Sequence, residues 1–226
     1  MALPQAVTLY AVDHAQIVAC DQQPEQELAS CAPVALEPPP APTTPRQRTG
    51  NPFHFDAQAQ LYRLTGIDLT RIAGLDAGTA LTVLGESGTD MRRWKTVKQF
   101  TSWLGLCPGT KVSGGKVQRS TTTPTANRAA AALRLAAASL FRSRSALGAY
   151  LRRMTGRLGK PQAVTATAHN LARLSYSRLR YGTAYVEVGQ DSYERQYQER
   201  VLRNLTRRAK DLGFVLLPEG AETPVT

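Results

Sequence analysis

Apolar residues recur at helical spacing in three consecutive segments of the second half of the chain. The stripes are Leu133, Ala136, Ala137, Leu140 and Phe141; then Leu147, Tyr150, Leu151, Met154 and Leu158; then Val164, Ala168, Leu171, Leu174 and Leu179. Residues three or four positions apart lie on one face of an α-helix, so each stripe predicts an amphipathic helix with a core-facing side. Pro161 near the start of the third segment and Gly182 near its end fit helix ends.

A helix-hairpin-helix-like element is predicted earlier in the chain. After a short helix at Ala57–Leu64, the run IAGLDAGTALTVLGESG indicates a helix, a tight turn at Gly74 and a second helix that ends before Gly88. Such a turn can present backbone N–H groups to a phosphate. Asp76, however, stands where a second glycine is usual, and a carboxylate is a good N-cap but a poor phosphate neighbour. A purely structural turn is therefore an equally weighted alternative.

Capping boxes mark the starts of two further helices. The boxes are Thr96 with Gln99, and Asp191 with Glu194. The first helix is expected to reach Leu104, with Gly105 and Pro108 after it. The second carries Tyr193, Tyr197, Val201 and Leu205, has both charge signs on its polar face, and is expected to stop at Gly213. A strand pattern is seen only in the short FVLL near the C-terminus, so the predicted fold class is all-α, a compact basic helical domain.

The first quarter of the chain differs from the rest. A short helix is predicted from Val7 to Leu28, with Pro24 expected to kink or end it. The run from Pro33 to Pro52 is rich in Pro and Thr, which is typical of an extended linker. The chain is therefore expected to divide into a residual coiled-coil-like helix at 1–30, a Pro-rich linker at 31–56, the helical domain at 57–215 and a flexible tail at 216–226.

The charge distribution favours a polyanionic partner. The chain has 28 Lys and Arg against 17 Asp and Glu, a net charge of +11, and no acidic residue lies between Met91 and Val186. Counterion release from nucleic acid is the usual compensation for such a run. A basic surface kept for solubility, or attraction to anionic lipid, remains an alternative.

Targeting features are not found in the sequence. There is no run of about 18 apolar residues and no secretory signal at the start, so we expect a cytoplasmic protein without a membrane partner. Cys20, Cys31 and Cys107 are too widely separated for a zinc or disulfide framework, and we expect reduced cysteines that pack in the fold.

A polar segment from Gly109 to Thr125 is the one candidate reaction site. It is predicted to be a Gly/Ser loop, in which Ser113 is followed by Gly114 and Gly115 and can approach a phosphodiester closely. Lys111, Lys116 and Arg119 could neutralise the charge that develops during attack. The alternative is an ordinary flexible loop, because Ser-Gly-Gly is common in loops. No acidic cluster for a metal lies in the basic half, and His14, His54 and His169 are isolated in sequence.

Several blocks, in one order from about Leu61 to the end, carry a resemblance to a known family. They are GLDAGTALTVLGESG, FTSWLGLCP, SGGKVQRS, ANRAAAALRLAAASL and ATAHNLARLSYSRLR. Together they resemble the C-terminal transposase domain of the insertion-sequence 110 (110/116/902) family of DEDD-type serine transposases. The block from GLCP to SGGK, followed by the helix that begins with Asn and Arg, is the most specific part.

The resemblance implies DNA recombination and transposition. In the family, an N-terminal domain similar to Holliday-junction resolvases holds an acidic metal cluster, a coiled-coil segment follows, and the C-terminal domain supplies a serine nucleophile. Ser113 takes the position of that serine. The positions that would contact nucleic acid are Lys111, Gly114, Gly115, Lys116, Arg119, Arg128 and Arg134. The implied partners are DNA, a structured guide RNA, and further copies or a complementing metal-binding domain.

Departures from the family pattern limit this inference. The acidic metal domain is not found in the 226 residues, so no cofactor is expected here and Mg²⁺ is expected only in that missing domain. Pro24, Asp76 and Pro124 are unusual for their positions. The chain is expected to be inactive alone, either as a truncated copy or as one piece of an interrupted gene. A non-catalytic protein that modulates an intact transposase, and a helical interaction module, remain alternatives.

Overall fold

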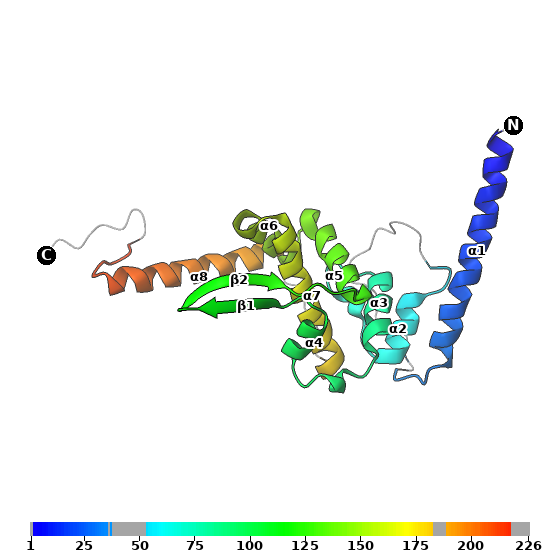
Figure 1. The fold of residues 1–226 in the computed structure, drawn as a ribbon, viewed down its shortest axis with the longest axis horizontal. Coiled ribbons are helices and arrows are strands. Elements are labelled where there is room, and N and C mark those ends of the chain that lie inside the picture. Colours follow the sequence, from blue (N-terminus) through cyan, green and yellow to red (C-terminus); the bar gives the residue numbers. More distant parts are fainter. Residues whose placement is uncertain (1, 36, 38–52, 183–188, 218–226) are drawn as a thin grey trace.

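The computed structural model describes residues 2–35, 37, 53–182 and 189–217, and within these it is mainly helical (Figure 1). The helices are α1 (Ala2–Ser30), α2 (Ala57–Thr65), α3 (Ala77–Ser87), α4 (Val97–Trp103), α5 (Arg128–Ser139), α6 (Ala146–Leu158), α7 (Lys160–Tyr181) and α8 (Gln190–Asp211), with 3₁₀ turns at Leu69–Arg71, Met91–Arg93 and Leu140–Arg142. One antiparallel hairpin, β1 (Pro108–Ser113) and β2 (Lys116–Thr122), is the exception to the predicted all-α class, which is otherwise confirmed.

The core forms around α7. Helices α4, α5 and α6 pack against it, and α3 packs on α5. The three predicted apolar stripes face this core, and all their residues except Leu158 are buried or half-buried. Tyr176 of α7 is buried, donates a hydrogen bond to the Trp94 carbonyl at 2.8 Å, and lies 5.6 Å from Phe100 between ring centroids. Alanines of α5 such as Ala129 and Ala137 are fully buried and let the helices approach closely.

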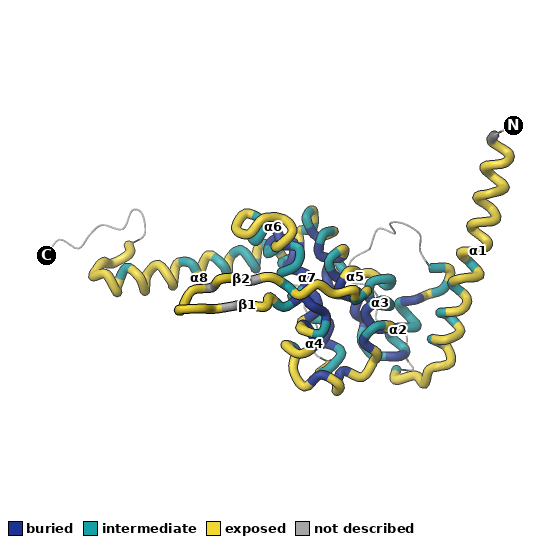
Figure 2. The backbone as a smooth tube through the Cα atoms, viewed as in Figure 1, coloured by how far each residue is buried: buried dark blue, intermediate teal, exposed yellow. Residues whose placement is uncertain are grey.

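Three elements project from the core. Figure 1 shows α1 leaving on one side, while α8 and the hairpin extend on the other. Figure 2 shows burial concentrated in the centre, and exposure along most of these three elements. These three projecting elements are therefore largely exposed to solvent.

Helix α1 contradicts the predicted break at Pro24. The helix continues through this proline to Ser30. Its last turn is held by α2, because the Arg63 guanidinium donates to the carbonyls of Leu28 and, at 3.3 Å, of Cys31. Proline removes one helical hydrogen bond, and in this exposed helix the freed carbonyl can bond to water instead.

Other details also differ from the sequence-based expectations. The Thr96 hydroxyl caps α4 as predicted, but Gln99 accepts from Lys95 N at 2.9 Å rather than completing the box. Helix α8 begins at Gln190 and has no side-chain cap, so the second box is wrong; Glu194 accepts from the Gln190 amide at 2.7 Å. The FVLL segment forms no strand.

All three cysteines are free, as expected, but Cys20 and Cys31 are exposed and do not pack in the fold. Most of the predicted linker, and the tail from residue 218, lie outside the described residues. No helix of the described part is long and apolar enough to cross a membrane.

Candidate nucleic-acid interface

The segment predicted to be a loop around Ser113 is a β-hairpin. Strand β1 pairs with β2 so that Ser113 is opposite Lys116, and a bulge follows Lys111. Gly114 and Gly115 form the turn, with φ values of +55° and +75°. Two consecutive positive φ values are the mark of a type I′ turn, which glycine adopts most easily. Ser113 is therefore the last residue of a strand, at the tip of a projecting ribbon.

The base of the hairpin is fixed to the core at Gly105. A Cβ atom on this glycine would lie 2.7 Å from Thr125 Cγ2 and 3.1 Å from the Thr123 carbonyl, so the chain crosses itself closely here. Leu104 and Leu106 on either side are buried. The core therefore holds both ends of the hairpin while the tip lies in solvent.

The described side chains of the hairpin contribute nothing to the core. Ser113 and Lys116 are exposed, and Val112 is 60% exposed. Lys111 and Arg119 are at paired positions of the two strands, and like charges at paired positions are unfavourable in a free hairpin. A two-stranded ribbon without a buried face is only marginally stable in water.

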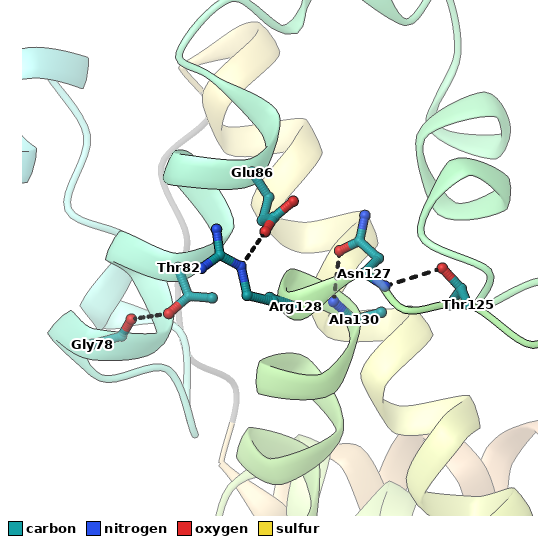
Figure 3. A network of polar contacts seen from close by, with 7 residues as sticks. All are labelled: Gly78, Thr82, Glu86, Thr125, Asn127, Arg128 and Ala130. Carbon is teal, nitrogen blue, oxygen red and sulfur yellow. Dashed lines mark hydrogen bonds and ion pairs between the residues drawn. The ribbon is translucent and has the colours of Figure 1, made fainter.

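Arg128 and Arg134 lie away from the tip of the hairpin. Figure 3 shows Arg128 in the first turn of α5, where its Nε donates to Glu86 Oε1 of α3 at 2.6 Å. The side chain is nevertheless 84% exposed. Asn127 caps the same helix and accepts from Ala130 N at 3.1 Å. Because α5 starts after the base of the hairpin, Arg128 is at the opposite end from Ser113. Arg134 is half-buried farther along α5.

The turn at Gly74 serves the packing of the fold. Only a 3₁₀ turn, not a full helix, precedes it, so the helix-hairpin-helix likeness is incomplete. Gly74 has a φ of +87°, and a Cβ there would lie 3.0 Å from Leu140 Cδ2. The Asp76 carboxylate accepts from Thr79 N at 2.7 Å and so occupies the start of α3. These contacts favour the structural alternative for Asp76 over phosphate binding.

Two substitutions at Asp76 separate these alternatives. Asp76→Ala is expected to lower the free energy of unfolding by about 1 kcal/mol, because the N-cap is removed. Asp76→Asn keeps a capping oxygen and removes the charge, and should leave both stability in urea and duplex DNA affinity near the wild-type values. Tighter DNA binding by Asp76→Asn would indicate that the turn contacts phosphate after all.

The histidines and the metal-ligand residues do not form a catalytic cluster. His14 and His54 are isolated in sequence but lie close together in the fold, with ring centroids 5.1 Å apart. Burial, together with the Arg173 guanidinium, lowers the pKa of His169, which is half-buried on α7. Within the described ranges, no group of three or more His, Cys, Asp or Glu residues could hold a metal ion.

A second group of cations was not predicted from the sequence. Arg92, Arg93, Lys95 and Lys98 are all exposed around the start of α4. Their density in the run MRRWKTVK was the available signal. They extend the basic surface beyond the hairpin.

Comparison with known families supports the expected resemblance for the middle of the chain. Residues 67–152 match the model of the Transposase IS116/IS110/IS902 family. The matched segment contains α3 to α5, the whole hairpin and most of α6. Searches of curated proteins and of solved structures found no match. The segment that carries Ser113 is therefore similar to transposases.

Proposed function

We propose that this chain is the nucleic-acid-binding part of a transposase, that it binds DNA through the β1–β2 hairpin, and that Ser113 is the nucleophile when a partner supplies the rest of the reaction site. The observation that carries the proposal is an exposed basic hairpin with a serine at its tip, inside the segment similar to transposases. The structured guide RNA and the further copies of the chain implied by the resemblance belong to the same proposal.

The shape of the hairpin suits a nucleic-acid groove. The major groove of B-form DNA admits a two-stranded β-ribbon, and several DNA-binding proteins use strands in this way. Near the tip, Gly114 and Gly115 have no side chains, so a phosphate can approach the backbone. Lys116, opposite Ser113 in the register, is the exposed cation nearest to the hydroxyl along the ladder. The contacts expected are to phosphates, which position the protein without reading sequence.

The chemistry proposed for Ser113 is a phosphoryl transfer. Its Oγ forms a bond to a phosphorus atom of the DNA backbone, and the bond from that phosphorus to one sugar oxygen breaks. The hydroxyl proton passes to a base of the partner, and the released sugar oxygen takes up a proton. Lys116 would stabilise the negative charge on the phosphate oxygens. The resemblance places the acidic metal-binding residues of the reaction in a separate N-terminal domain, so we assign them to the partner.

A salt titration tests the binding proposal. We expect the full chain to bind duplex DNA with an affinity that falls steeply with salt, and the Lys111→Ala/Lys116→Ala/Arg119→Ala variant to bind more weakly. If each cation neutralises one phosphate, the negative slope of log K against log salt should become shallower by about 0.9 for each phosphate that the variant no longer neutralises. Fluorescence anisotropy over a salt series gives this slope, and a structured RNA measured in parallel shows which nucleic acid is preferred.

A neutral triple variant is the matched control. Thr110→Ala/Gln118→Ala/Thr121→Ala changes the same two strands but no charge, and its salt slope should equal that of the wild type. If the cationic and neutral variants weaken binding equally, shape and not charge is responsible. Undiminished binding by the cationic variant would contradict the hairpin proposal.

A further inference from the structure

Among the described residues, the side-chain contacts that hold helix α8 to the core lie in its first two turns. The Arg152 guanidinium of α6 donates to the Gln190 side chain at 2.7 Å, and Gly189 forms a bridge with Ser145. The Arg153 guanidinium stacks on the Tyr197 ring, 3.4 Å from its centroid, and lies 5.1 Å from that of Tyr193. Two arginines that the sequence places in the basic region therefore hold α8 against α6.

The outer half of α8 projects away from the core. No residue of α8 is buried, and Leu202 and Leu205 are 56% and 46% exposed. Figure 2 shows the helix becoming almost wholly exposed toward its C-terminal end. The amino acids of this half are therefore not explained by packing within the described chain.

The two halves of α8 differ in charge. Asp191, Glu194 and Glu199 lie in the first half, whereas residues 200–210 contain five cations and no acidic residue. Arg200, Arg203, Arg207 and Lys210 are all exposed, and they are separated by three or four positions. This spacing puts them on one face of the helix, over about 15 Å of its length at a rise of 1.5 Å per residue. The ion pair found among the described residues, Arg128 with Glu86, lies elsewhere.

Like charges three or four residues apart destabilise a helix, and an anionic partner that covers this face would relieve the repulsion. We propose that the outer half of α8, residues 200–210, is a second nucleic-acid-binding surface, an arm that contacts phosphates beyond those reached by the hairpin. The inference rests on the proposed function in one respect, because the same nucleic acid would occupy both surfaces. The hairpin and α8 extend on the same side of the core (Figure 1), which makes this geometrically reasonable.

An anionic membrane surface is the competing partner. A helix with a basic face and exposed leucines on another face can lie on such a surface. Nucleic acid is favoured here, because the arm projects on the same side of the core as the basic hairpin (Figure 1), and the hairpin lies in the segment that is similar to transposases. Membrane binding is therefore treated as an outcome of the test.

The test removes the charge of the arm in the full chain. The Arg200→Ala/Arg203→Ala/Arg207→Ala/Lys210→Ala variant should make the negative slope of log K against log salt shallower by about 2 to 4 for a duplex that is long enough to reach both surfaces. Alanine favours helix, and no residue of α8 is buried, so the core and the helix should persist by circular dichroism. The control Arg200→Lys/Arg203→Lys/Arg207→Lys keeps the charge and should retain most of the wild-type slope.

The result for the arm can be separated from the result for the hairpin. In the Lys111→Ala/Lys116→Ala/Arg119→Ala background, removal of the arm cations should still make the slope of log K against log salt shallower, whether or not the hairpin contributes. An unchanged slope in both backgrounds would overturn the inference. So would tight binding to vesicles with anionic lipid that depends on the arm, together with duplex binding that does not. The alanine variant is compared with the lysine variant if it has less helix by circular dichroism. A decrease in DNA affinity by the lysine variant as large as that of the alanine variant would show that the charge of the arm is not responsible, and would also overturn the inference.

Discussion

Ser113→Ala is expected to abolish covalent attachment to DNA while leaving DNA affinity unchanged. The hydroxyl oxygen is the atom proposed to form the bond to phosphorus, and no other atom of alanine can replace it. Binding should persist, because the cations and the turn are unaltered and the exposed serine side chain contributes nothing to the core. The measurement is the amount of protein–DNA adduct that survives denaturing electrophoresis, after the chain is combined with Mg²⁺ and the acidic metal-binding domain of a transposase of the matched family.

A second hydroxyl on the same strand provides the control. Thr110→Ala removes an exposed hydroxyl from β1 and should form adduct like the wild type. If the wild type binds DNA but gives no adduct, the alternative of a non-catalytic binder that modulates an intact transposase would be preferred. Adduct formation by Ser113→Ala would show that another residue is the nucleophile.

Substitution of the turn at the tip should have a large effect on DNA binding, the step that Ser113→Ala leaves unchanged. Gly114→Val/Gly115→Val puts β-branched side chains where φ is +55° and +75°. The left-handed region costs about 1–2 kcal/mol for each residue with a Cβ, and more for a branched one. Because none of the described hairpin side chains is buried, packing cannot offset this cost. We expect the hairpin to open and DNA affinity to fall at least as far as in the cationic triple variant.

The core should be unaffected by that change. The thermal midpoint of unfolding is expected to stay near the wild-type value, while trypsin cleavage at Lys111 and Lys116 becomes faster. Gly109→Ala in the same hairpin is the matched control, because this glycine has no positive φ and an added Cβ would lie 3.5 Å from the Thr121 carbonyl, an ordinary contact. Wild-type affinity in the valine variant would mean that the hairpin does not bind DNA.

The helical core could be predicted from the sequence, and the hairpin could not. The stripes that include Leu133, Leu151 and Leu171 are periodic because each helix has one buried face, and burial is what creates such a pattern. None of the described side chains of β1 and β2 is buried, so among them burial does not force apolar and polar residues to alternate. The available signal was the Gly-Gly pair between two Lys-Val dipeptides.

The remaining differences come from contacts between distant residues. The end of α1 is fixed by Arg63, more than 30 positions away, which the local rule for Pro24 does not include. Arg152 and Arg153 belong to the stretch without acidic residues that favoured a polyanionic partner, whereas contacts with Gln190 and Tyr197 show that they hold α8. Asp76 is the opposite case, because its N-cap role depends on a residue three positions away and was visible in the sequence.

Because the chain crosses itself at Gly105, the length of the hairpin can change without a change in the packing of the core. Because both ends of the hairpin are fixed at that point, residues can be added near the tip without disturbing the packing below. A strand rises about 3.4 Å per residue, so two extra residues in each strand would carry Ser113 about 7 Å farther out and keep it on the same face. One extra residue in each strand would turn it to the opposite face. The distance from core to target phosphate is therefore an adjustable dimension, available in steps of two residues.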